Sequence, residues 1–371
     1  MTQLRDLLET SVENGTVPGA AALVAQGDDV EIAGAGEVEP ESIVRIASIT
    51  KPITAAALMI LMDEGLVSLD DPIARWLPEL ASPQVVRTLE STIDDVVPAA
   101  RAITVEDVLT FRAGWGFPSD FSLPAVVELF QKLPVFGPQE TPDEWLATLA
   151  QVPMLSQPGE AWLYNTCSDI QGVLIARVSG NSLPEFLAER IFEPLGMTDS
   201  SFYVPSEKLD RLPPHHAPDF AQLDDGLWTE PPIFPSGAGG LVSTLADWHR
   251  FGHMLLAGGD GLLSPQSVRL MTTDHLTQEQ REAAMLFLEG AGWGFGGSVA
   301  TDGRYGWIGG TGTTAHIAPS TGTVGILLTQ LQMAGPTPTQ FMREFGSTPS
   351  ERSAGDCHPA VKIRQRPGVR P

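Results

Sequence analysis

The stretch RIASITKP, residues 45–52, leads into the apolar run ITAAALMILM, which ends at Met62. Residues three or four apart lie on one face of a helix, so Ser48 and Lys51 share a face at the first turn of a helix predicted over about 48–64. The proline at position 52 is tolerated there, because N–H groups of the first turn have no intrahelical partner. The chain has four lysines and places one of them where a helix enters the core.

These two residue types, at this spacing, can support nucleophilic catalysis. A serine hydroxyl is a weak nucleophile until a base takes its proton. A lysine that loses contact with water has its pKa lowered toward neutrality, where it can act as that base or relay the proton. The alternative is that Ser48 caps the helix and Lys51 lies at the surface, since S-x-x-K occurs by chance in many proteins.

A tyrosine and a late glycine-rich turn favour the catalytic interpretation. Tyr164 is one of three tyrosines and stands between the turn QPGE and an apolar helix, the kind of junction that often holds active-site groups. The stretch YGWIGGTGTTAHI, residues 305–317, predicts two strands joined near Gly309 and Gly310, where the backbone can approach a bound group closely. A backbone N–H from that turn, paired with that of Ser48, would form an oxyanion hole. The plainer alternatives are a half-buried tyrosine and an ordinary hairpin.

Strand patterns at both ends of the chain predict the fold class. The segment GAAALVAQGDDVEIAGAGEV, residues 19–38, predicts two strands around a Gly-Asp-Asp turn, and the chain after residue 291 predicts three antiparallel strands. Mainly helical patterns, broken by Pro- and Gly-rich loops, fill the residues between them. We therefore predict an α/β (α+β) protein with one antiparallel sheet built from both chain ends and flanked by helices. A large, mainly helical domain is inserted into it.

The predicted domain boundaries follow the same change of pattern. Residues 1–65 and 291–345 form the sheet domain in two segments. Residues 66–290 form a mainly helical domain with loop insertions, of which 204–240 is proline-rich and irregular. Residues 346–371 show no periodicity and are expected to form a poorly ordered tail.

Composition and charge exclude several classes of function. A hydrophobic fraction of 42% is ample for a globular core. The formal net charge of −24 argues against nucleic acid and anionic membrane surfaces as partners. The first residues predict an acidic, amphipathic helix rather than a signal peptide, and the longest apolar run is too short to span a bilayer. We expect a cytoplasmic protein that is a monomer or a weak homo-oligomer.

Cysteine and histidine spacing predicts no metal site. Cys167 and Cys357 are distant in sequence and form no CxxC pattern. His249 and His253 have the i, i+4 spacing of helical metal ligands, but the glutamate of an H-E-x-x-H motif is missing. A solvated or packed histidine pair is therefore the better interpretation, and we expect no metal and no organic cofactor.

Several blocks, in order along residues 1–335, together resemble the serine β-lactamase and penicillin-recognising superfamily, with the fold of class C β-lactamases and penicillin-binding proteins. Within it, the chain is most similar to the family VIII carboxylesterases. The blocks are VRIASITKP, EGLVSLDDPIARWLPE, ITVEDVLTFRAGW, QPGEAWLYNT, EPLGMTDSSF, GGLVSTLADWHRF and GWIGGTGT. The resemblance implies a β-lactamase/DD-peptidase-like fold.

The resemblance also implies roles for individual residues. Ser48 matches the acylated nucleophile, and Lys51 matches its lysine partner. Tyr164 matches the tyrosine that shares the proton transfers. Gly310 would supply the second oxyanion N–H, beside that of Ser48.

Two departures from the family pattern bear on the substrate. Trp307 stands where lactamases have a lysine that helps to hold the substrate carboxylate, and Thr166 stands where class C lactamases have an asparagine. Because tryptophan offers an apolar face and cannot pair with an anion, we expect a small neutral ester as substrate. The expected substrate-binding residues are Trp307, Gly309, Thr166, Trp162, Trp115 and Phe117, although core packing is an equal alternative for the aromatic ones.

The sequence thus predicts a serine carboxylesterase that works through a Ser48 acyl-enzyme, with Lys51 and Tyr164 as proton-transfer partners. Three alternatives within the class are β-lactamase, DD-peptidase or D-amidase activity, and acyl transfer to an acceptor other than water is a further one. A non-enzyme alternative is a catalytically silent, penicillin-binding-like protein that only binds ligands. The intact set of Ser48, Lys51 and Tyr164 argues against the last of these.

Overall fold

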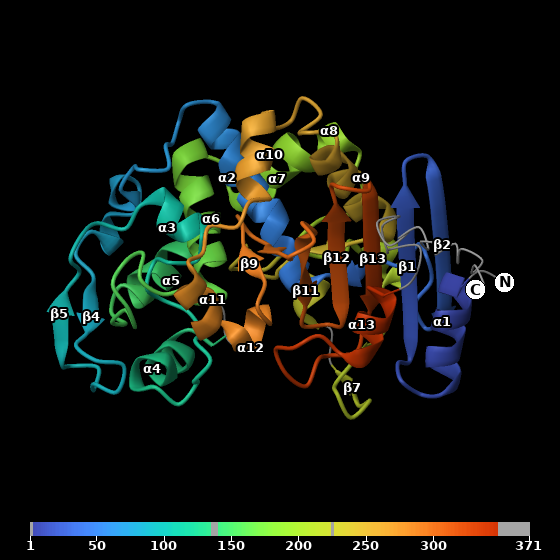
Figure 1. Ribbon diagram of the computed structural model, residues 1–371, viewed down its shortest axis with the longest axis horizontal. Helices are drawn as coiled ribbons and strands as arrows, with labels where there is room; N and C mark the ends of the chain where they lie inside the picture. Colours follow the sequence, from blue (N-terminus) through green and yellow to red (C-terminus); the bar gives the residue numbers. More distant parts are fainter. Residues whose placement is uncertain (1–2, 135–139, 224–225, 348–371) are drawn as a thin grey trace, which may run out of the picture.

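The computed structural model describes residues 3–134, 140–223 and 226–347 (Figure 1). Its main sheet has the strand order β2-β1-β13-β12-β11-β10-β9, and neighbouring strands pair antiparallel. Its strands are β1 (Gly19–Gln26), β2 (Asp29–Gly36), β9 (Gly292–Trp293), β10 (Ser298–Val299), β11 (Tyr305–Gly309), β12 (Thr313–Ala318) and β13 (Thr323–Thr329). The pairing of β1 with β13 joins the two ends of the chain, which confirms the predicted sheet. Beyond the three strands predicted after residue 291, the short strands β9 and β10 extend its edge.

Strand β1 is apolar from Gly19 to Ala25 because helices cover both faces of the sheet. Side chains alternate between the two faces of a strand. Ala21 and Leu23 belong to the large core on the helical side, whereas Ala20 and Ala22 belong to a smaller core on the other side. The sheet is therefore an inner layer of the molecule at this point.

Two helices cover the outer face of the sheet. Helix α1 (Gln3–Glu13) buries Leu4 and Leu8 there, as its amphipathic pattern predicts. Helix α13 (Gln340–Phe345) adds Phe341 and Phe345 to the same core. The predicted tail at 346–371 falls, after Ser347, outside the described residues.

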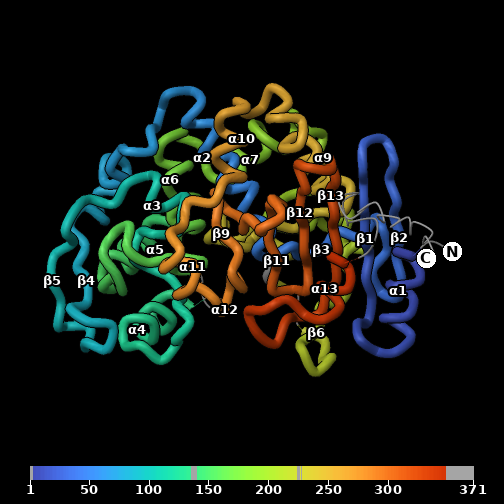
Figure 2. The backbone as a smooth tube through the Cα atoms, in the orientation of Figure 1, coloured from blue at the N-terminus to red at the C-terminus, as the bar shows by residue number. Residues whose placement is uncertain are grey.

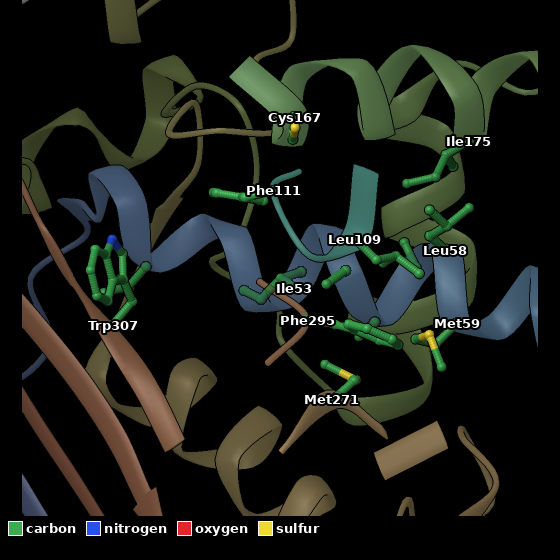
Figure 3. Packing of buried hydrophobic residues seen from close by; sticks show 14 of the residues in the cluster. Ile53, Leu58, Met59, Leu109, Phe111, Cys167, Ile175, Met271, Phe295 and Trp307 are labelled. Atoms are coloured by element: carbon green, nitrogen blue, oxygen red, sulfur yellow. The ribbon is translucent and has the colours of Figure 1, made fainter. Parts of the chain in front are cut away.

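Helix α2 (Lys51–Asp63) crosses the opposite side of the sheet, and every residue from Lys51 to Leu61 is buried. The predicted helix begins as a 3₁₀ turn, η1 (Ala47–Thr50), and becomes α-helical at Lys51. Helix α2 packs against α6 (Thr166–Ser179), and Figure 3 shows the apolar side chains around it, among them Ile53, Leu58, Met59, Leu109 and Ile175. A helix buried on all sides explains why its sequence is apolar almost all round.

The chain between α2 and β9 is mainly helical and, in the residues that the structure describes, carries five short strands, four of which pair with one another while β8 pairs with β3, before α2. Its further helices are α3 (Val105–Leu109), α4 (Pro124–Lys132), α5 (Pro142–Leu149), α7 (Leu183–Leu187), α8 (Glu193–Leu195), α9 (Leu245–Leu256), α10 (Pro265–Met271), α11 (Gln278–Ala283) and α12 (Met285–Leu288). The pairs are β3 (Val44–Arg45) with β8 (Val242–Ser243), β4 (Gln84–Val86) with β5 (Val96–Pro98), and β6 (His215–His216) with β7 (Gln222–Leu223). Figure 2 shows β4 and β5 at the end of the molecule opposite to β1 and β2.

The region predicted as irregular, 204–240, contains the β6–β7 hairpin and short 3₁₀ turns. None of the helices in the described part of the chain is long and apolar enough to cross a membrane.

Candidate active site

Ser48 lies on the η1 turn, which the β11–β12 connection holds in place. The Thr313 hydroxyl donates a hydrogen bond to the Ile46 carbonyl at 2.9 Å, and the Thr311 hydroxyl donates one to the Arg45 carbonyl at 2.6 Å. These threonines lie more than 260 residues after the segment that they bind. The fold therefore brings the late glycine-rich turn directly against the residues that lead into Ser48.

Lys51 is fully buried one helical turn after Ser48 and makes three hydrogen bonds. Its Nζ donates to Ser48 Oγ at 2.9 Å, to Asn165 Oδ1 at 2.9 Å and to the Ala238 carbonyl at 2.6 Å. Burial lowers the pKa of Lys51 to about 7, and the negative charge of Asp169 acts in the opposite direction. The neutral amine is therefore present near pH 7, as a proton acceptor must be.

Tyr164 lies beside Lys51 and Ser48. Its hydroxyl accepts a hydrogen bond from the Trp307 indole N–H at 2.7 Å. Burial raises the pKa of Tyr164 to about 12, although the Ser48 hydroxyl and the Trp307 N–H act to lower it. The Lys51 nitrogen lies 4.7 Å from the centre of the tyrosine ring. Ser48, Lys51 and Tyr164, which sequence reasoning singled out, thus meet in one place.

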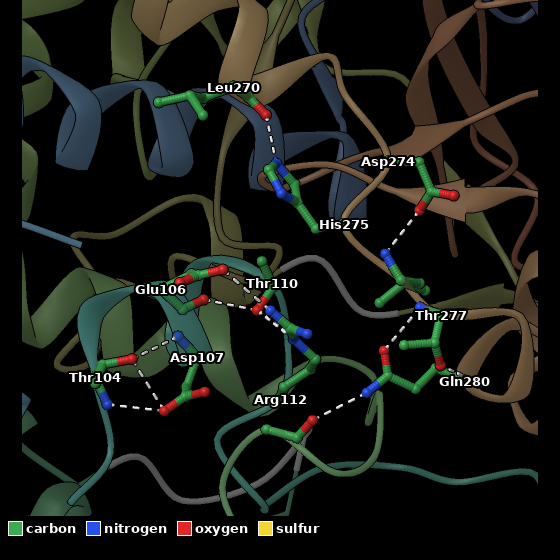
Figure 4. Close-up of polar contacts among 12 residues, drawn as sticks. Thr104, Glu106, Asp107, Thr110, Arg112, Leu270, Asp274, His275, Thr277 and Gln280 are labelled. Atoms are coloured by element: carbon green, nitrogen blue, oxygen red, sulfur yellow. Dashed lines mark hydrogen bonds and ion pairs between the residues drawn. The ribbon is translucent and has the colours of Figure 1, made fainter. Parts of the chain in front are cut away.

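The backbone around Tyr164 is held on two sides. A two-way bridge joins it to Phe117, with N–H to carbonyl distances of 2.9 and 3.0 Å. Gln280, shown in Figure 4, donates to the carbonyls of Gly159 and Glu160 in the turn that precedes Tyr164. The side chain of Gln280 also caps helix α11 with Thr277, so its position is set by that helix start.

Sequence reasoning missed Asn165 as a site residue. Its backbone has φ +82° and ψ −67°, the strained conformation of a γ-turn, which the Thr166 N–H closes by donating to the Tyr164 carbonyl at 3.3 Å. Its side chain accepts a hydrogen bond from Lys51. Thr166, the position that the family comparison favoured, is the first residue of α6 and is buried. The sequence feature that could have identified Asn165 is its place between Tyr164 and the apolar helix.

The two glycines at the end of β11 differ in their surroundings. A side chain on Gly309 would meet the Ile46 carbonyl at 2.5 Å and Ala47 at 3.2 Å, so only glycine permits this approach. Gly310 is exposed, and its carbonyl accepts a hydrogen bond from the Met333 N–H at 2.7 Å. The strand end thus lies in contact with the segment before Ser48.

The predicted aromatic residues occupy different places. Trp307 and Trp162 both flank Tyr164, with ring centres 5.6 and 5.8 Å from its ring. Phe117 stacks on Phe130 beside the Tyr164 backbone bridge. Trp115 lies in the core, where its indole N–H donates to the Val152 carbonyl at 2.8 Å.

Phe287 is an aromatic neighbour of Tyr164 that sequence reasoning missed. It comes from α12, and its ring centre lies 4.8 Å from that of Tyr164. The pattern of an isolated phenylalanine in a short helix carries no signal for this position. Phe287 also contacts Phe121, which is 39% exposed, so the aromatic surface extends from Tyr164 to the solvent.

The two histidines singled out by their spacing, His249 and His253, pack against each other on α9. His316 accepts or donates a hydrogen bond at 2.9 Å with Thr314, on the face of β12 opposite to Ala315 and the main core. Across the described residues, His, Cys, Asp and Glu side chains form no group of three that could hold a metal ion.

Comparisons with known proteins identify the family and the fold. The sequence matches the Beta-lactamase family over residues 4–341. Protein Rv1367c of Mycobacterium tuberculosis is 36% identical, over 85% of this chain and 86% of its own length. The lovastatin esterase of Penicillium rubens is 30% identical, over 81% of this chain and 84% of its own length. Among solved structures, EstCE1, described as a hydrolase with promiscuous acyltransferase activity, superposes with a TM-score of 0.78 at 22% identity, over 92% of this chain and 97% of its own.

The fold and the family match define the class of serine hydrolases and acyltransferases with a β-lactamase/DD-peptidase fold. The chain belongs to the β-lactamase family. Its relatives include esterases, which confirms the resemblance and the fold class predicted from the sequence.

Proposed function

We propose that this protein is a serine carboxylesterase of the family VIII type, which cleaves small neutral esters through an acyl-enzyme on Ser48. The observation that carries the proposal is the 2.9 Å hydrogen bond between Lys51 Nζ and Ser48 Oγ inside a buried site. Esterase relatives support the reaction class, because lovastatin esterase aligns with most of the chain. The particular substrate is part of the proposal.

In the proposed first step, Ser48 Oγ attacks the ester carbonyl and transfers its proton to the neutral Lys51 amine. The carbonyl oxygen becomes an oxyanion that the N–H groups of Ser48 and Gly310 stabilise, with about 3 kcal/mol expected for each donor. Tyr164 then donates a proton to the leaving alcohol and is reprotonated through Lys51. General acid–base help of this kind contributes a factor of about a hundred or more.

Water completes the cycle in the second step. The same Lys51–Tyr164 pair takes a proton from water as it attacks the acyl carbonyl. The bond between the acyl carbon and Ser48 Oγ then breaks, Oγ receives that proton back, and the carboxylic acid is released. With a pKa near 7 for Lys51 and near 12 for Tyr164, lysine is the group that is available as a base at neutral pH. Tyrosine keeps its proton and is suited to the donor role.

The expected preference for neutral substrates depends on Trp307. Its indole faces Tyr164 at the position where a carboxylate-binding lysine stands in lactamases, and it uses its N–H on the tyrosine hydroxyl. An anionic substrate would find no cation there. We therefore expect weak turnover of carboxylated β-lactams.

Acyl transfer is the second candidate, favoured by relatives with that activity. An acyltransferase of Penicillium decumbens, calJ, is 26% identical to this chain. The matched region spans 70% of this chain and 63% of calJ. An acyl-enzyme on Ser48 can pass its acyl group to an alcohol in place of water by the same steps. Adding an alcohol acceptor to the assay and measuring the new ester against the free acid distinguishes the two reactions.

The decisive experiment is hydrolysis of p-nitrophenyl butyrate by the purified protein, with nitrocefin as the lactam comparison. We expect ester turnover that falls by at least about a hundredfold in Ser48→Ala and in Tyr164→Phe. A serine-reactive fluorophosphonate should label the wild type and leave Ser48→Ala unlabelled. Faster turnover of nitrocefin than of the ester would instead identify a lactamase or peptidase. If neither substrate is turned over and the fluorophosphonate does not label the protein, it is a silent binding protein.

A further inference from the structure

Asp169 lies in the first turn of α6, the helix that follows Tyr164. Its Oδ1 accepts a hydrogen bond from the Ser236 hydroxyl at 2.6 Å and from the Ala238 N–H at 3.1 Å. The same residue, Ala238, presents its carbonyl to Lys51 Nζ at 2.6 Å. One peptide segment thus connects the Asp169 carboxylate to the lysine nitrogen.

This segment, residues 236–238, is a tight turn enclosed between α2 and α6. The Thr54 hydroxyl of α2 donates to the Gly237 carbonyl at 2.8 Å. A side chain on Gly237 would meet the Ser168 carbonyl of α6 at 2.4 Å, so the turn fits only without one. Because Thr54 holds the turn from the other side, loss of Asp169 alone leaves part of its anchoring in place.

The groups that face Lys51 come from three elements. Ser48 lies on its own helix start, Tyr164 and Asn165 come from the start of α6, and the Ala238 carbonyl comes from the turn. Asp169 is the charged side chain whose field acts on Lys51. Burial raises the pKa of Asp169, while its hydrogen bonds and the positive charge of Lys51 lower it, as expected of two buried groups that stabilise each other's charged forms.

We propose that Asp169 is the positioning residue of the catalytic lysine: it holds the 236–238 turn so that the Ala238 carbonyl meets Lys51 Nζ, and its negative charge balances the buried ammonium. The proposal rests on the proposed function in one respect, that Lys51 is the base for Ser48. Its consequence is that Asp169 sets the pH above which the lysine is neutral, without touching the substrate.

Two substitutions separate the charge of Asp169 from its hydrogen bonds. Asp169→Asn keeps an oxygen that can accept from Ser236 and Ala238 but removes the charge. Asp169→Ala removes both. A matched control is Asp247→Asn on α9, because Asp247 also accepts from a serine hydroxyl, Ser200, and from a backbone N–H, yet these contacts do not lead to Lys51.

The first readout is the titration of Lys51 itself, followed by NMR of lysine labelled with ¹³C at the ε carbon. Four lysines give a spectrum that can be assigned, with Lys51→Met identifying the signal. We expect the Lys51 midpoint to lie at lower pH in Asp169→Asn than in the wild type, and to be unchanged in Asp247→Asn. This measurement needs no ester turnover, so it tests Asp169 even where the proposed function fails.

The second readout is steady-state ester hydrolysis as a function of pH. We expect the acid limb of the kcat/KM profile to move to lower pH in Asp169→Asn, relative to its own plateau. In Asp169→Ala we expect kcat to fall about a hundredfold with KM nearly unchanged, because a misplaced lysine affects the chemical step. Circular dichroism of each variant checks that it is folded. If Asp169→Ala does not fold, the measurements on Asp169→Asn still test the proposal.

The proposal is overturned by a Lys51 midpoint that does not move in Asp169→Asn. It is also overturned where Asp169→Ala retains the kcat of Asp247→Asn. An effect of Asp169 on thermal stability alone, with both readouts unmoved, would leave it a structural residue.

Discussion

At the scale of single residues, the site depends on how little water reaches Lys51. A lysine with an ordinary pKa is protonated at neutral pH and cannot accept a proton from serine. Here the side chain is fully buried, and its pKa is about 7. The Lys51 ammonium donates to three oxygens, those of Ser48, Asn165 and Ala238. The neutral amine keeps two N–H groups for Asn165 and Ala238, and its lone pair can accept a hydrogen bond from the Ser48 hydroxyl.

The pH dependence of the reaction follows from this lysine. Neutral Lys51 gains population as pH rises through about 7, so we expect kcat/KM for a neutral ester to rise over the same range. Tyr164, with a pKa of about 12, stays protonated throughout. A pH–rate profile measured from pH 5 to 9 checks this, and a flat profile down to pH 5 would contradict a neutral-lysine mechanism.

Trp307 provides a second residue-scale prediction. Trp307→Phe keeps an aromatic ring but removes the N–H that donates to the Tyr164 hydroxyl. We expect kcat to fall about fivefold, as for the loss of one hydrogen bond worth about 1 kcal/mol.

The matched control is Trp293→Phe, which alters the indole packed against Trp307 and leaves the Tyr164 hydrogen bond intact. Equal losses of kcat in the two variants would assign the effect to packing and not to the hydrogen bond.

At the scale of elements, the important contact joins the end of β11 to the 3₁₀ turn η1. Two threonine hydroxyls and one glycine make this contact. They lie on β11, β12 and the connection between these two inner strands of the sheet. Helix α2 continues from η1 and is buried along eleven residues, which makes the start of the helix a rigid platform for Ser48. Ser48 is thus held in position by the packing around it.

Gly309→Ala should disturb this contact. The added methyl group would lie 2.1 Å from the Thr313 hydroxyl and 2.5 Å from the Ile46 carbonyl, so the strand must move away from η1. We expect a drop of about a hundredfold in kcat/KM, because misplacement of about 1 Å at a catalytic group has that effect.

Gly335→Ala is the control, since no atom lies within 4 Å of the position of its added carbon. Kinetics and thermal unfolding of both variants test the prediction. Normal activity in Gly309→Ala would show that the position of the strand end does not matter to the reaction.

At the scale of the whole molecule, charge and layering act together on the substrate. The chain carries a formal net charge of −24, and the site lies where the sheet meets the helices. An acidic protein repels anions over a distance that dissolved salt shortens to about 10 Å at 0.1 M. Aromatic rings around Tyr164 form an apolar surface, which also disfavours a charged substrate.

We therefore expect kcat/KM for a carboxylated ester to be lower than for its neutral isostere, with a difference that narrows as salt increases. Paired assays from low salt to 1 M sodium chloride measure it. The neutral ester serves as the internal control, because its rate should change little. If the ratio of the two kcat/KM values stays constant with salt, the preference is due to Trp307 and not to the net negative charge of the protein.

The sequence by itself determined the parts that depend on local pattern. The spacing of Ser48 and Lys51 on one helical face, the amphipathic helix at the N-terminus and the strands at both ends follow from periodicities of two and 3.6 residues. A sheet built from both chain ends was predictable because the long strand patterns lie there, whereas the strand order and the short strands β9 and β10 came from the structure. Tyr164 was recognised through its place before an apolar helix.

Only the tertiary structure decided which groups surround the lysine. Asn165 reaches Lys51 across 114 positions and the Ala238 carbonyl across 187, while Trp307 reaches Tyr164 across 143. Trp115 was predicted to bind substrate, but it lies in the core, which its sequence context does not reveal. Such contacts depend on how separate elements pack, and a backbone carbonyl has no residue type by which a pattern could identify it.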